Sequence, residues 1–362
     1  MKDLSTAAEK RVTIHDIARV TGVSIATVSG AFTGKRRIAE STRDLILRTA
    51  KEMGFSPDPL AQRLSTGRFA NTVALLMTSD LGVSTQTMWS LKDLLLQRGF
   101  EVHDRNRPLY LGDVEVLQTK MLQEICLQNP QAILCENESL QPGAIKVLRR
   151  YVDNGGVLVC WGSVNAPSRS QELAVDHVLI DLEEGGFLQA THLIGLGHRK
   201  LGLYEHGMRR TELTAGTFIG GFKRALSKAG LEFRPEWTSA ACCYEKAGMQ
   251  HAQHFLALKE RPTGVGIIND NAASAFVNAV MRAGLKVPDD VSVVGYDDTA
   301  AAEAAFVPLT TIRRPVEEVS LAIVETLCKR LSGDGQKPPH DQVIRGELII
   351  RQSTAAPRLE SR

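Results

Sequence analysis

Aromatic residues, cysteine and long apolar runs are all scarce in this sequence of 362 residues. Phe, Trp and Tyr together make up 5% of the chain, and the six cysteines include no CxxC pair. A disulfide-stapled scaffold is therefore excluded, and we interpret the adjacent Cys242 and Cys243 as packing residues rather than a redox pair. No apolar run approaches the length of a membrane-spanning helix, which excludes a helical integral membrane protein.

Targeting signals and low-complexity segments are missing as well. Residues 1–11 lack the apolar stretch of a signal peptide, so we expect a cytoplasmic protein with no membrane partner. The composition is otherwise that of an ordinary globular protein, with 43% hydrophobic and 23% charged residues. A chain of this length predicts two or three domains, because single cores stop growing at smaller sizes.

The common enzyme motifs are also absent, since the sequence contains no Walker A, GxSxG or HExxH pattern. Residues 195–199 contain two glycines but lack the GxGxxG spacing, and they follow a predicted helix rather than a strand. His251 and His254 lie one turn apart without Cys or carboxylate partners at ligand spacing, so a surface helix is favoured over a metal site. We therefore predict no catalytic residues, no cofactor and no metal.

The net charge of +2 conceals an uneven distribution of charge along the chain. Residues 1–68 carry 12 Lys and Arg against 7 Asp and Glu, whereas the remainder carries 31 against 34. A basic small end on a mildly acidic body indicates that the small end meets a polyanion. The alternative is a solvated basic tail, which charge alone does not exclude.

Residues 12–55 are predicted to form three short helices. Thr13 and Asp16 provide a capping-box-like start for the first helix. Gly22 then allows a tight turn, and Ser24 caps the second helix. The predicted apolar face of the first helix consists of Ile17, Ala18 and Val20. Two helices joined by a short glycine turn form the helix-turn-helix pattern.

A third helix is predicted from Glu40 to Met53, with its inward stripe at helical spacing. The stripe consists of Leu45 or Ile46, Thr49, Ala50 and Met53. The segment Pro57-Asp58-Pro59 then ends one element and starts another. Leu60–Leu64 gives little more than one helical turn, which is marginal alone and is expected to fold only against something else.

From residue 71 onward, apolar strands alternate with helices, which predicts doubly wound parallel sheets. The predicted strands are Thr72–Met77, Ala132–Cys135, Val157–Trp161, Val178–Ile180, Leu201–Tyr204, Val265–Ile268 and Val291–Gly295. The predicted helices include Ser90–Arg98, Gly185–Leu196, Phe218–Ala229, Ala247–Leu258 and Ala272–Ala283. About 290 residues suit two lobes better than one sheet.

The helix-turn-helix segment resembles the headpiece of the lactose-repressor (LacI/GalR) family. The matching segments are, in order, Val12–Ser29, Thr42-Arg43, Gly54–Pro57, Leu60–Leu64, Leu196–Arg199, Asn269-Asp270, Val293–Asp298 and Pro308–Ile312. They span nearly the whole chain at compatible spacings. The resemblance implies a homodimeric regulator that binds double-stranded operator DNA and has a core like a periplasmic sugar-binding protein.

The predicted fold class is α+β multidomain, with an all-α helix-turn-helix headpiece and a two-lobed α/β doubly wound, periplasmic-binding-protein-like core. The expected divisions are a disordered tail at 1–11, the DNA-binding domain at 12–57, a hinge helix and linker at 58–70, an effector-binding and dimerisation core at 71–352, and a C-terminal tail at 353–362.

In a helix-turn-helix, the N-terminal residues of the second helix read bases in the major groove, while hydroxyls, amides and basic groups hold phosphates. The resemblance further implies that Leu64 wedges into the minor groove from a hinge helix ordered by the operator. The candidate DNA-contacting residues are Thr13, Ser24, Ile25, Ala26, Thr27, Ser29, Gly30, Arg36, Arg37, Arg43, Ala61 and Leu64.

The recognition helix departs from the family at three of these positions. Gly30 stands where relatives usually carry Arg, so it cannot make the bidentate contact to guanine. Ile25 and Ala26 lack hydrogen-bonding side chains but can meet thymine methyl groups. We expect an operator preference unlike the usual one. The alternative is a ligand-binding or enzymatic α/β protein that has lost operator binding.

The predicted ligand-binding residues are Asn269 and Asp297, which follow strands at the edge where open α/β sheets bind ligands. An amide and a carboxylate there can hold vicinal hydroxyls, so a small-molecule effector, for example a sugar or sugar derivative, is expected. A loop turn or helix cap is the alternative role for Asp297 and Asp298. Arg209 and Arg210 could meet an anionic effector, but a solvated pair is favoured. Trp89 and Trp161 could stack on a ring, although core packing is favoured.

Overall fold

The structure is a computed structural model of the chain. It describes residues 12–33, 38–53, 55, 69–77, 83–106, 113–137, 140–164, 173–206, 217–241, 246–332 and 338–358. Several sequence predictions fall outside the described residues, namely those for residues 1–11, Arg36, Arg37, Ala61, Leu64, Arg209, Arg210, Cys242 and Cys243.

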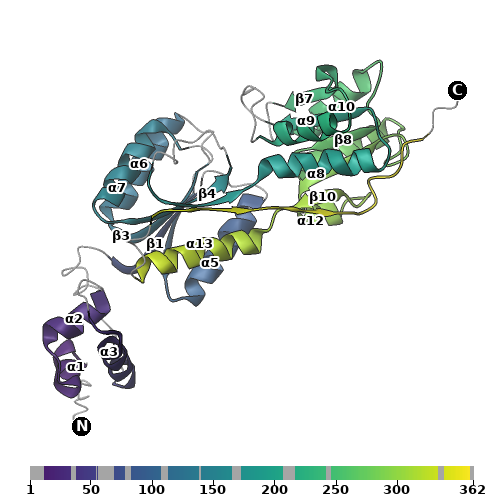
Figure 1. The fold of residues 1–362 in the computed structure, drawn as a ribbon. Coiled ribbons are helices and arrows are strands. Elements are labelled where there is room, and N and C mark those ends of the chain that lie inside the picture. Colours follow the sequence, from purple (N-terminus) through teal and green to yellow (C-terminus); the bar gives the residue numbers. More distant parts are fainter. Residues whose placement is uncertain are drawn as a thin grey trace, which may run out of the picture.

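The N-terminal helices form a small cluster with its own core, and they lie apart from both sheets in Figure 1. They are α1 (Ile14–Thr21), α2 (Ile25–Thr33) and α3 (Glu40–Glu52). Their buried core consists of Ile17, Ala18, Val28, Ala31, Ile46 and Ala50. The predicted helices are confirmed, but the prediction that Val20 packs inward is wrong, because Val20 is 60% exposed.

Two six-stranded sheets make up the rest of the molecule. The strands of the first sheet, in spatial order, are β11 (Asp341–Ile344), β5 (Asp176–Ile180), β4 (Val157–Ser163), β3 (Pro130–Glu136), β1 (Phe69–Met77) and β2 (Glu101–Asn106). The paired strands in it are all parallel. Helices α5 (Val83–Gln97) and α13 (Val316–Leu331) cover one face, and α6 (Val114–Leu127) and α7 (Pro142–Asp153) cover the other (Figure 1).

The apolar runs of the first sheet are explained by this double cover. In β1, Val73 and Leu75 are buried in the core under α5 and α13, while Ala74 and Leu76 are buried in the core under α6 and α7. A strand covered on both faces must be apolar at every position rather than at every second one. The continuous apolar run 73–77 within the predicted strand Thr72–Met77 therefore correctly indicated a buried parallel strand.

The second sheet is also six-stranded and covered by helices on both faces, but one of its edge strands is antiparallel. Its strands, in spatial order, are β12 (Glu347–Ile349), β10 (Thr310–Arg313), β9 (Ser292–Asp297), β8 (Gly264–Ile267), β6 (Leu201–His206) and β7 (Thr238–Ala241), and β12 runs antiparallel to β10. Its helices are α8 (Leu182–Gly195), α9 (Phe218–Lys228), α10 (Ala247–Ala257), α11 (Asp270–Arg282) and the short α12 (Ala300–Glu303). Helices α8 and α9 pack on one face, and α10 and α11 pack on the other.

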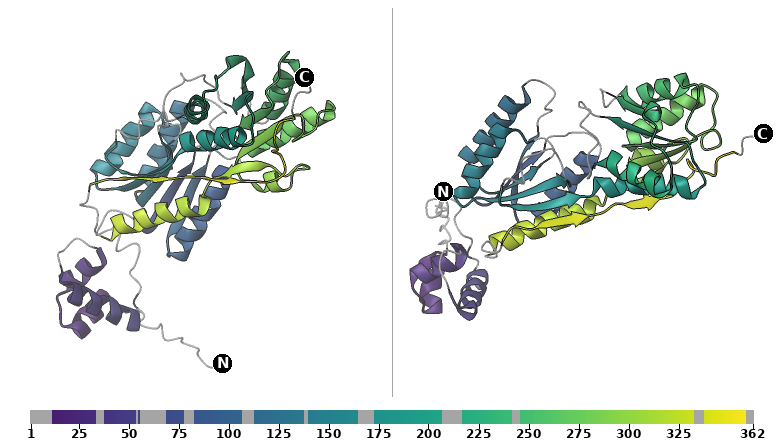
Figure 2. Two further views of the ribbon diagram at one scale, coloured as in Figure 1. Left: turned by 45° about the vertical axis from the view of Figure 1, so that its right-hand side comes forward. Right: turned by 45° about the horizontal axis from the view of Figure 1, so that its top comes forward.

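The chain passes between the two sheets three times. It leaves the first sheet after β5 for α8, returns after β10 into α13, and crosses again from β11 to β12. Figures 1 and 2 show the last crossing as a long yellow stretch running along both lobes. The predicted fold class, a helical N-terminal unit plus a two-lobed doubly wound core, is confirmed.

Three sequence interpretations are corrected by burial. Trp89 is 62% exposed on α5, so the preference for core packing holds only for Trp161, which is 3% exposed. His251 is fully buried, its ring stacks 5.1 Å from that of Tyr204, and its Nδ1 lies 2.9 Å from Ser239 Oγ. The helix carrying it is therefore not a surface helix at that position. The segment 353–358, predicted as tail, is anchored by Ser353, whose hydroxyl donates to Val293 O at 2.6 Å.

Within the described ranges, no helix is both long and apolar enough to cross a membrane. The same residues contain no group of three or more His, Cys, Asp or Glu side chains placed to hold a metal ion. The four cysteines that the structure describes are free thiols.

An ion pair with a buried carboxylate ties α13 to β5, the strand next to the β11 edge of the first sheet. Asp176 in β5 is 3% exposed and accepts hydrogen bonds from the Arg330 guanidinium, at 2.7 Å from Nη2, and from the backbone N–H of His340, at 3.1 Å. Burial alone would raise the pKa of Asp176, but these hydrogen bonds and the Arg330 charge hold it below its ordinary value.

Replacing this carboxylate is expected to destabilise the protein strongly. Asp176→Ala should lower the free energy of unfolding by about 3 kcal/mol, because it removes the carboxylate that pairs with the Arg330 guanidinium, whose side chain is 15% exposed. Asp289→Ala is the matched control, since its pair with Arg358 is exposed and should contribute at most about 1 kcal/mol. The lowered pKa means that the Asp176 contribution is present at neutral pH and is lost as the pH falls. Urea unfolding at pH 7, and at pH values stepped down from 4 to 2, measures both effects, because the folded pKa of Asp176 lies below 3.8. Equal losses in the two variants would contradict the assignment.

Candidate functional site

The first turn of α2 presents the side chains that the sequence predicts for base reading. Ser24 precedes the helix, and its Oγ accepts a hydrogen bond from the backbone N–H of Thr27 at 3.1 Å. Its Oγ also lies 2.8 Å from Thr27 Oγ1. Ile25 is 41% exposed and Ala26 is exposed as well, so a small, largely apolar surface flanked by hydroxyls faces solvent.

The remaining described candidates lie around this turn rather than on it. Thr13 precedes α1, where its backbone N–H and hydroxyl both donate to Asp16 Oδ2, at 3.0 and 2.8 Å. Arg43 is half-buried on α3. Ser29 is half-buried on α2, and Gly30 beside it is buried. The DNA contacts assigned to these residues stay predictions, and that of Gly30 would need its backbone to become accessible.

A second candidate site lies at the carboxyl edge of the second sheet. Strands β8, β9 and β10 are parallel neighbours, and Arg313 pairs in register with Asp297. Parallel strands end at the same edge, where open α/β sheets bind ligands. Asn269 follows β8 and Asp297 ends β9, so the structure brings the two predicted ligand residues to this edge together.

Only one of the two polar atoms of the Asn269 side-chain amide has a hydrogen-bond partner within the protein. Its Oδ1 accepts a hydrogen bond from the backbone N–H of Ala272 at 2.7 Å, which caps α11. Its Nδ2 is buried and has no hydrogen-bond partner, although the residue is only 2% exposed. A buried amide donor without a partner carries a free-energy cost that a bound acceptor would relieve.

Asp297 has a strained backbone conformation and a side-chain pKa well above its ordinary value. It is 7% exposed, and its φ of 109° lies in the left-handed region that non-glycine residues avoid. Burial raises the pKa of Asp297 to about 7, the Arg314 charge 3.6 Å away opposes that rise, and the Asp270 charge adds to it. A carboxyl that titrates near neutral pH in a strained backbone is characteristic of functional sites.

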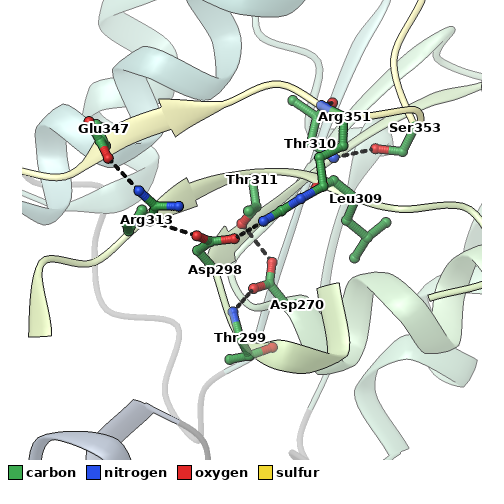
Figure 3. A network of polar contacts seen from close by, with 10 residues as sticks. All are labelled: Asp270, Asp298, Thr299, Leu309, Thr310, Thr311, Arg313, Glu347, Arg351 and Ser353. Carbon is green, nitrogen blue, oxygen red and sulfur yellow. Dashed lines mark hydrogen bonds and ion pairs between the residues drawn. The ribbon is translucent and has the colours of Figure 1, made fainter. Parts of the chain in front are cut away.

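Asp270 and Asp298 form the supporting network drawn in Figure 3, which the sequence did not single out as a site. Asp270 is fully buried, and it accepts hydrogen bonds from Thr311 Oγ1 at 2.6 Å and from the backbone N–H of Thr299 at 2.8 Å. Burial raises its pKa to about 6. Asp298 pairs with Arg313 at 2.7 Å and Arg351 at 2.6 Å, which ties β9 to β10 and to the C-terminal segment.

Glu205 is a further carboxylate at this edge that sequence reasoning missed. It is the fifth residue of β6, and burial raises its pKa to about 6. Because Tyr204 pairs with Ile267, Glu205 lies beside Ile268 and one residue short of Asn269. The signal was present, because Glu205 directly follows the predicted strand 201–204 just as Asn269 follows its own.

Residues 13–58 match the family model described as "Bacterial regulatory proteins, lacI family". The chain belongs to the lacI family. Residues 190–354 of this lacI-family protein match a second model, described as a periplasmic binding protein-like domain. This range contains all strands of the second sheet and the last two crossings between the sheets, from β10 to α13 and from β11 to β12.

Full-length relatives support the assignment. The chain is 27% identical over 341 residues to "HTH-type transcriptional repressor PurR" of Mannheimia succiniciproducens, covering 94% of this chain and 98% of the relative. The same identity and coverage hold over 343 residues for the protein of that name from Haemophilus influenzae.

Solved structures share the fold. A lac repressor dimer bound to operator and the anti-inducer ONPF is similar with a TM-score of 0.68 at 22% identity, covering 96% of this chain and 100% of that one. A CelR–cellobiose complex is similar with a TM-score of 0.66 at 23% identity, covering 95% and 100%. The lacI-family chain therefore has the architecture of these regulators from end to end.

Proposed function

We propose that this lacI-family protein is a sequence-specific transcriptional repressor whose hold on operator DNA is controlled by a small molecule. The observation that carries the proposal is that lacI-family similarity extends from the helix-turn-helix through the whole core, so both halves of a DNA-binding regulator are present. The exposed first turn of α2 supports base reading in a major groove. The relatives named as repressors favour repression over activation.

The DNA-binding unit is proposed to work as a homodimer on double-stranded operator. Ser24, Ile25, Ala26, Thr27, Ser29 and Gly30 would face the major groove, with Thr13, Arg36, Arg37 and Arg43 near phosphates. Ala61 and Leu64 would enter the minor groove from a hinge helix within residues 58–70. Two-fold protein symmetry imposes a pseudo-palindromic site. The similar lac repressor, solved as a dimer bound to operator, supports this arrangement.

The effector is proposed to bind at the carboxyl edge of the second sheet, on Asn269 and Asp297. The unpartnered Asn269 Nδ2 and the buried Asp297 carboxyl offer a donor and an acceptor to one ligand. The regulator solved with cellobiose supports a sugar or sugar derivative as one class to test. The protein would act in the cytoplasm, where its DNA is, and would catalyse no reaction.

Selection of binding sites from random DNA tests the proposal. The full chain should enrich a pseudo-palindromic sequence whose half-sites differ from the usual family preference, because Ile25, Ala26 and Gly30 change the reading surface. Affinity for the selected site should fall steeply with salt, since phosphate contacts release counterions. A chain that enriches no sequence over input, while remaining folded, would favour the alternative that operator binding has been lost.

A further inference from the structure

We propose that this protein recognises the C5-methyl groups of pyrimidines in its operator, so that 5-methylcytosine substitutes there for thymine. The inference deepens the proposed function, because it rests on operator binding by α2 and names the chemical group that α2 reads. It also makes the affinity for DNA responsive to C5 methylation of cytosine. The observations that carry it are the side chains of α2 and the hydrogen bonds at its first turn.

Helix α2 lacks every side chain that reads a base through paired or charged hydrogen bonds. The side chains that distinguish bases in this way are Arg, Lys, Asn, Gln, Asp and Glu. The sequence of α2 is IATVSGAFT, which contains none of them. Its only polar side chains are hydroxyls, each of which has one proton to donate. A recognition helix of this composition has to take most of its sequence information from apolar contacts.

The two hydroxyls at the first turn of α2 are engaged with each other. The backbone N–H of Thr27 donates to Ser24 Oγ at 3.1 Å, and the two side-chain oxygens lie 2.8 Å apart. One of the two hydroxyl protons is therefore used within the pair, in the arrangement that caps a helix. The proton that remains gives little discrimination, because a Ser or Thr hydroxyl bonds to more than one kind of base edge.

The apolar side chains of the same turn face outward. Ile25 is 41% exposed, whereas Val28 and Ala31 of this helix are 0% and 2% exposed in the core of the N-terminal unit. Ala26 is also exposed, and it lies two residues before Val28, which is about 200° around the helix. Two neighbouring hydrocarbon groups therefore occupy the surface that a helix-turn-helix places against the base edges.

The apolar group that a base presents in the major groove is the C5-methyl of thymine. Cytosine carries a hydrogen atom at the same position, and C5 methylation restores the methyl group without changing the hydrogen-bonding groups of the base. Covering one methyl with Ile25 or Ala26 removes apolar surface from water, which should raise the affinity about fourfold. A pair of 5-methylcytosine with guanine offers this contact as well as a thymine–adenine pair does.

The test uses the full chain, the operator selected from random DNA, and fluorescence anisotropy at one fixed salt concentration. Each thymine of a half-site is replaced in turn by uracil, which removes only the methyl group, by cytosine, and by 5-methylcytosine. At the positions that face α2, thymine should bind about fourfold more tightly than uracil, and 5-methylcytosine about fourfold more tightly than cytosine. Changing both half-sites of the pseudo-palindrome should raise each ratio to about fifteenfold.

Protein variants assign the contact to its residues. Ile25→Ala and Ala26→Gly should each bring both ratios toward one at the base that the residue covers, because the hydrocarbon is removed. Leu47→Ala is the matched control, since Leu47 lies on α3 and is also 41% exposed, and it should leave both ratios unchanged. Each ratio compares two DNAs bound to the same protein variant, so a general loss of helix stability cancels in it.

The outcomes separate methyl recognition from operator binding. Ratios near one at every pyrimidine of the half-site would overturn the inference and leave operator binding intact. A preference for thymine over uracil without one for 5-methylcytosine over cytosine would overturn the response to methylation. Ratios that persist in both α2 variants would overturn the assignment to Ile25 and Ala26. A folded chain that selects no operator would overturn the proposed function, and the inference with it.

Discussion

Deleting residues 1–60 is expected to abolish operator binding while leaving the two-sheet core folded. The deletion removes α1, α2 and α3, which share a hydrophobic core among themselves. The basic N-terminal segment that would hold phosphates goes with them. Specific binding exceeds non-specific binding by roughly 10³-fold or more, and the truncated chain should lose at least that factor.

Fluorescence anisotropy on the selected operator, at one fixed salt concentration, measures the loss. Circular dichroism and thermal unfolding of the truncated chain provide the control for folding. The matched variant is the full chain with Ser24→Ala, which should weaken specific binding far less than the deletion. A truncated chain that is folded and binds operator as tightly as the full chain would place the DNA-binding surface elsewhere.

The neighbouring residues Asp297 and Asp298 are expected to respond oppositely to mutation. Asp298→Ala should lower the free energy of unfolding by about 3 kcal/mol, because it leaves Arg351, 16% exposed at its side chain, without its carboxylate. Asp297→Asn should raise the free energy of unfolding at pH 8 by about 2 kcal/mol, because the pKa of Asp297 is raised to about 7, so the cost of burying its charge exceeds the attraction of Arg314. The protein would retain Asp297 for binding rather than for stability.

The pH dependence separates these two effects. The pKa of Asp297 is raised to about 7, so its contribution to stability is present at low pH and is lost as the pH rises through 7. The wild type should therefore lose stability between pH 5 and pH 8, and Asp297→Asn should lose less. A residual slope would belong to Asp270 and Glu205, whose pKa values are both raised to about 6. Chemical denaturation across this range measures the slopes, and parallel curves would contradict the assignment of the charge.

The sequence predicted the strands that carry a continuous apolar run and missed the edge strands that carry none. Residues 73–77 and 132–135 are apolar at every position because both faces of their strands are covered, and a continuous apolar run of this kind is a strong strand signal. Strand β2 is an edge strand of Glu, His, Asp and Arg residues, and β11 has three exposed residues out of four. Neither carries an apolar run. Helix α13 was not among the predicted helices, although its buried residues Val319, Ile323 and Leu327 recur at helical spacing.

The candidate site was predictable only where a residue directly follows a strong strand. Asn269 and Asp297 met that condition, and both lie at the carboxyl edge. Asp270, Asp298 and their partners could not be assigned, because Arg313 and Arg351 reach them from segments distant in sequence. Tertiary contacts decide which carboxylates are paired with an arginine. The spacing of residues in the sequence does not show it.

Because the chain passes between the sheets three times, the first lobe cannot finish folding until late in translation. Strands β1 to β5 emerge from the ribosome first, but the face that they share is covered by Val319, Ile323 and Leu327 of α13, and their edge is completed only by β11 at 341–344. Helix α5 covers only part of that face, so the first lobe is left with apolar surface uncovered until almost the entire chain has been translated. Chains cut short by a premature stop before residue 316 should expose that face and aggregate rather than persist as a stable half-protein.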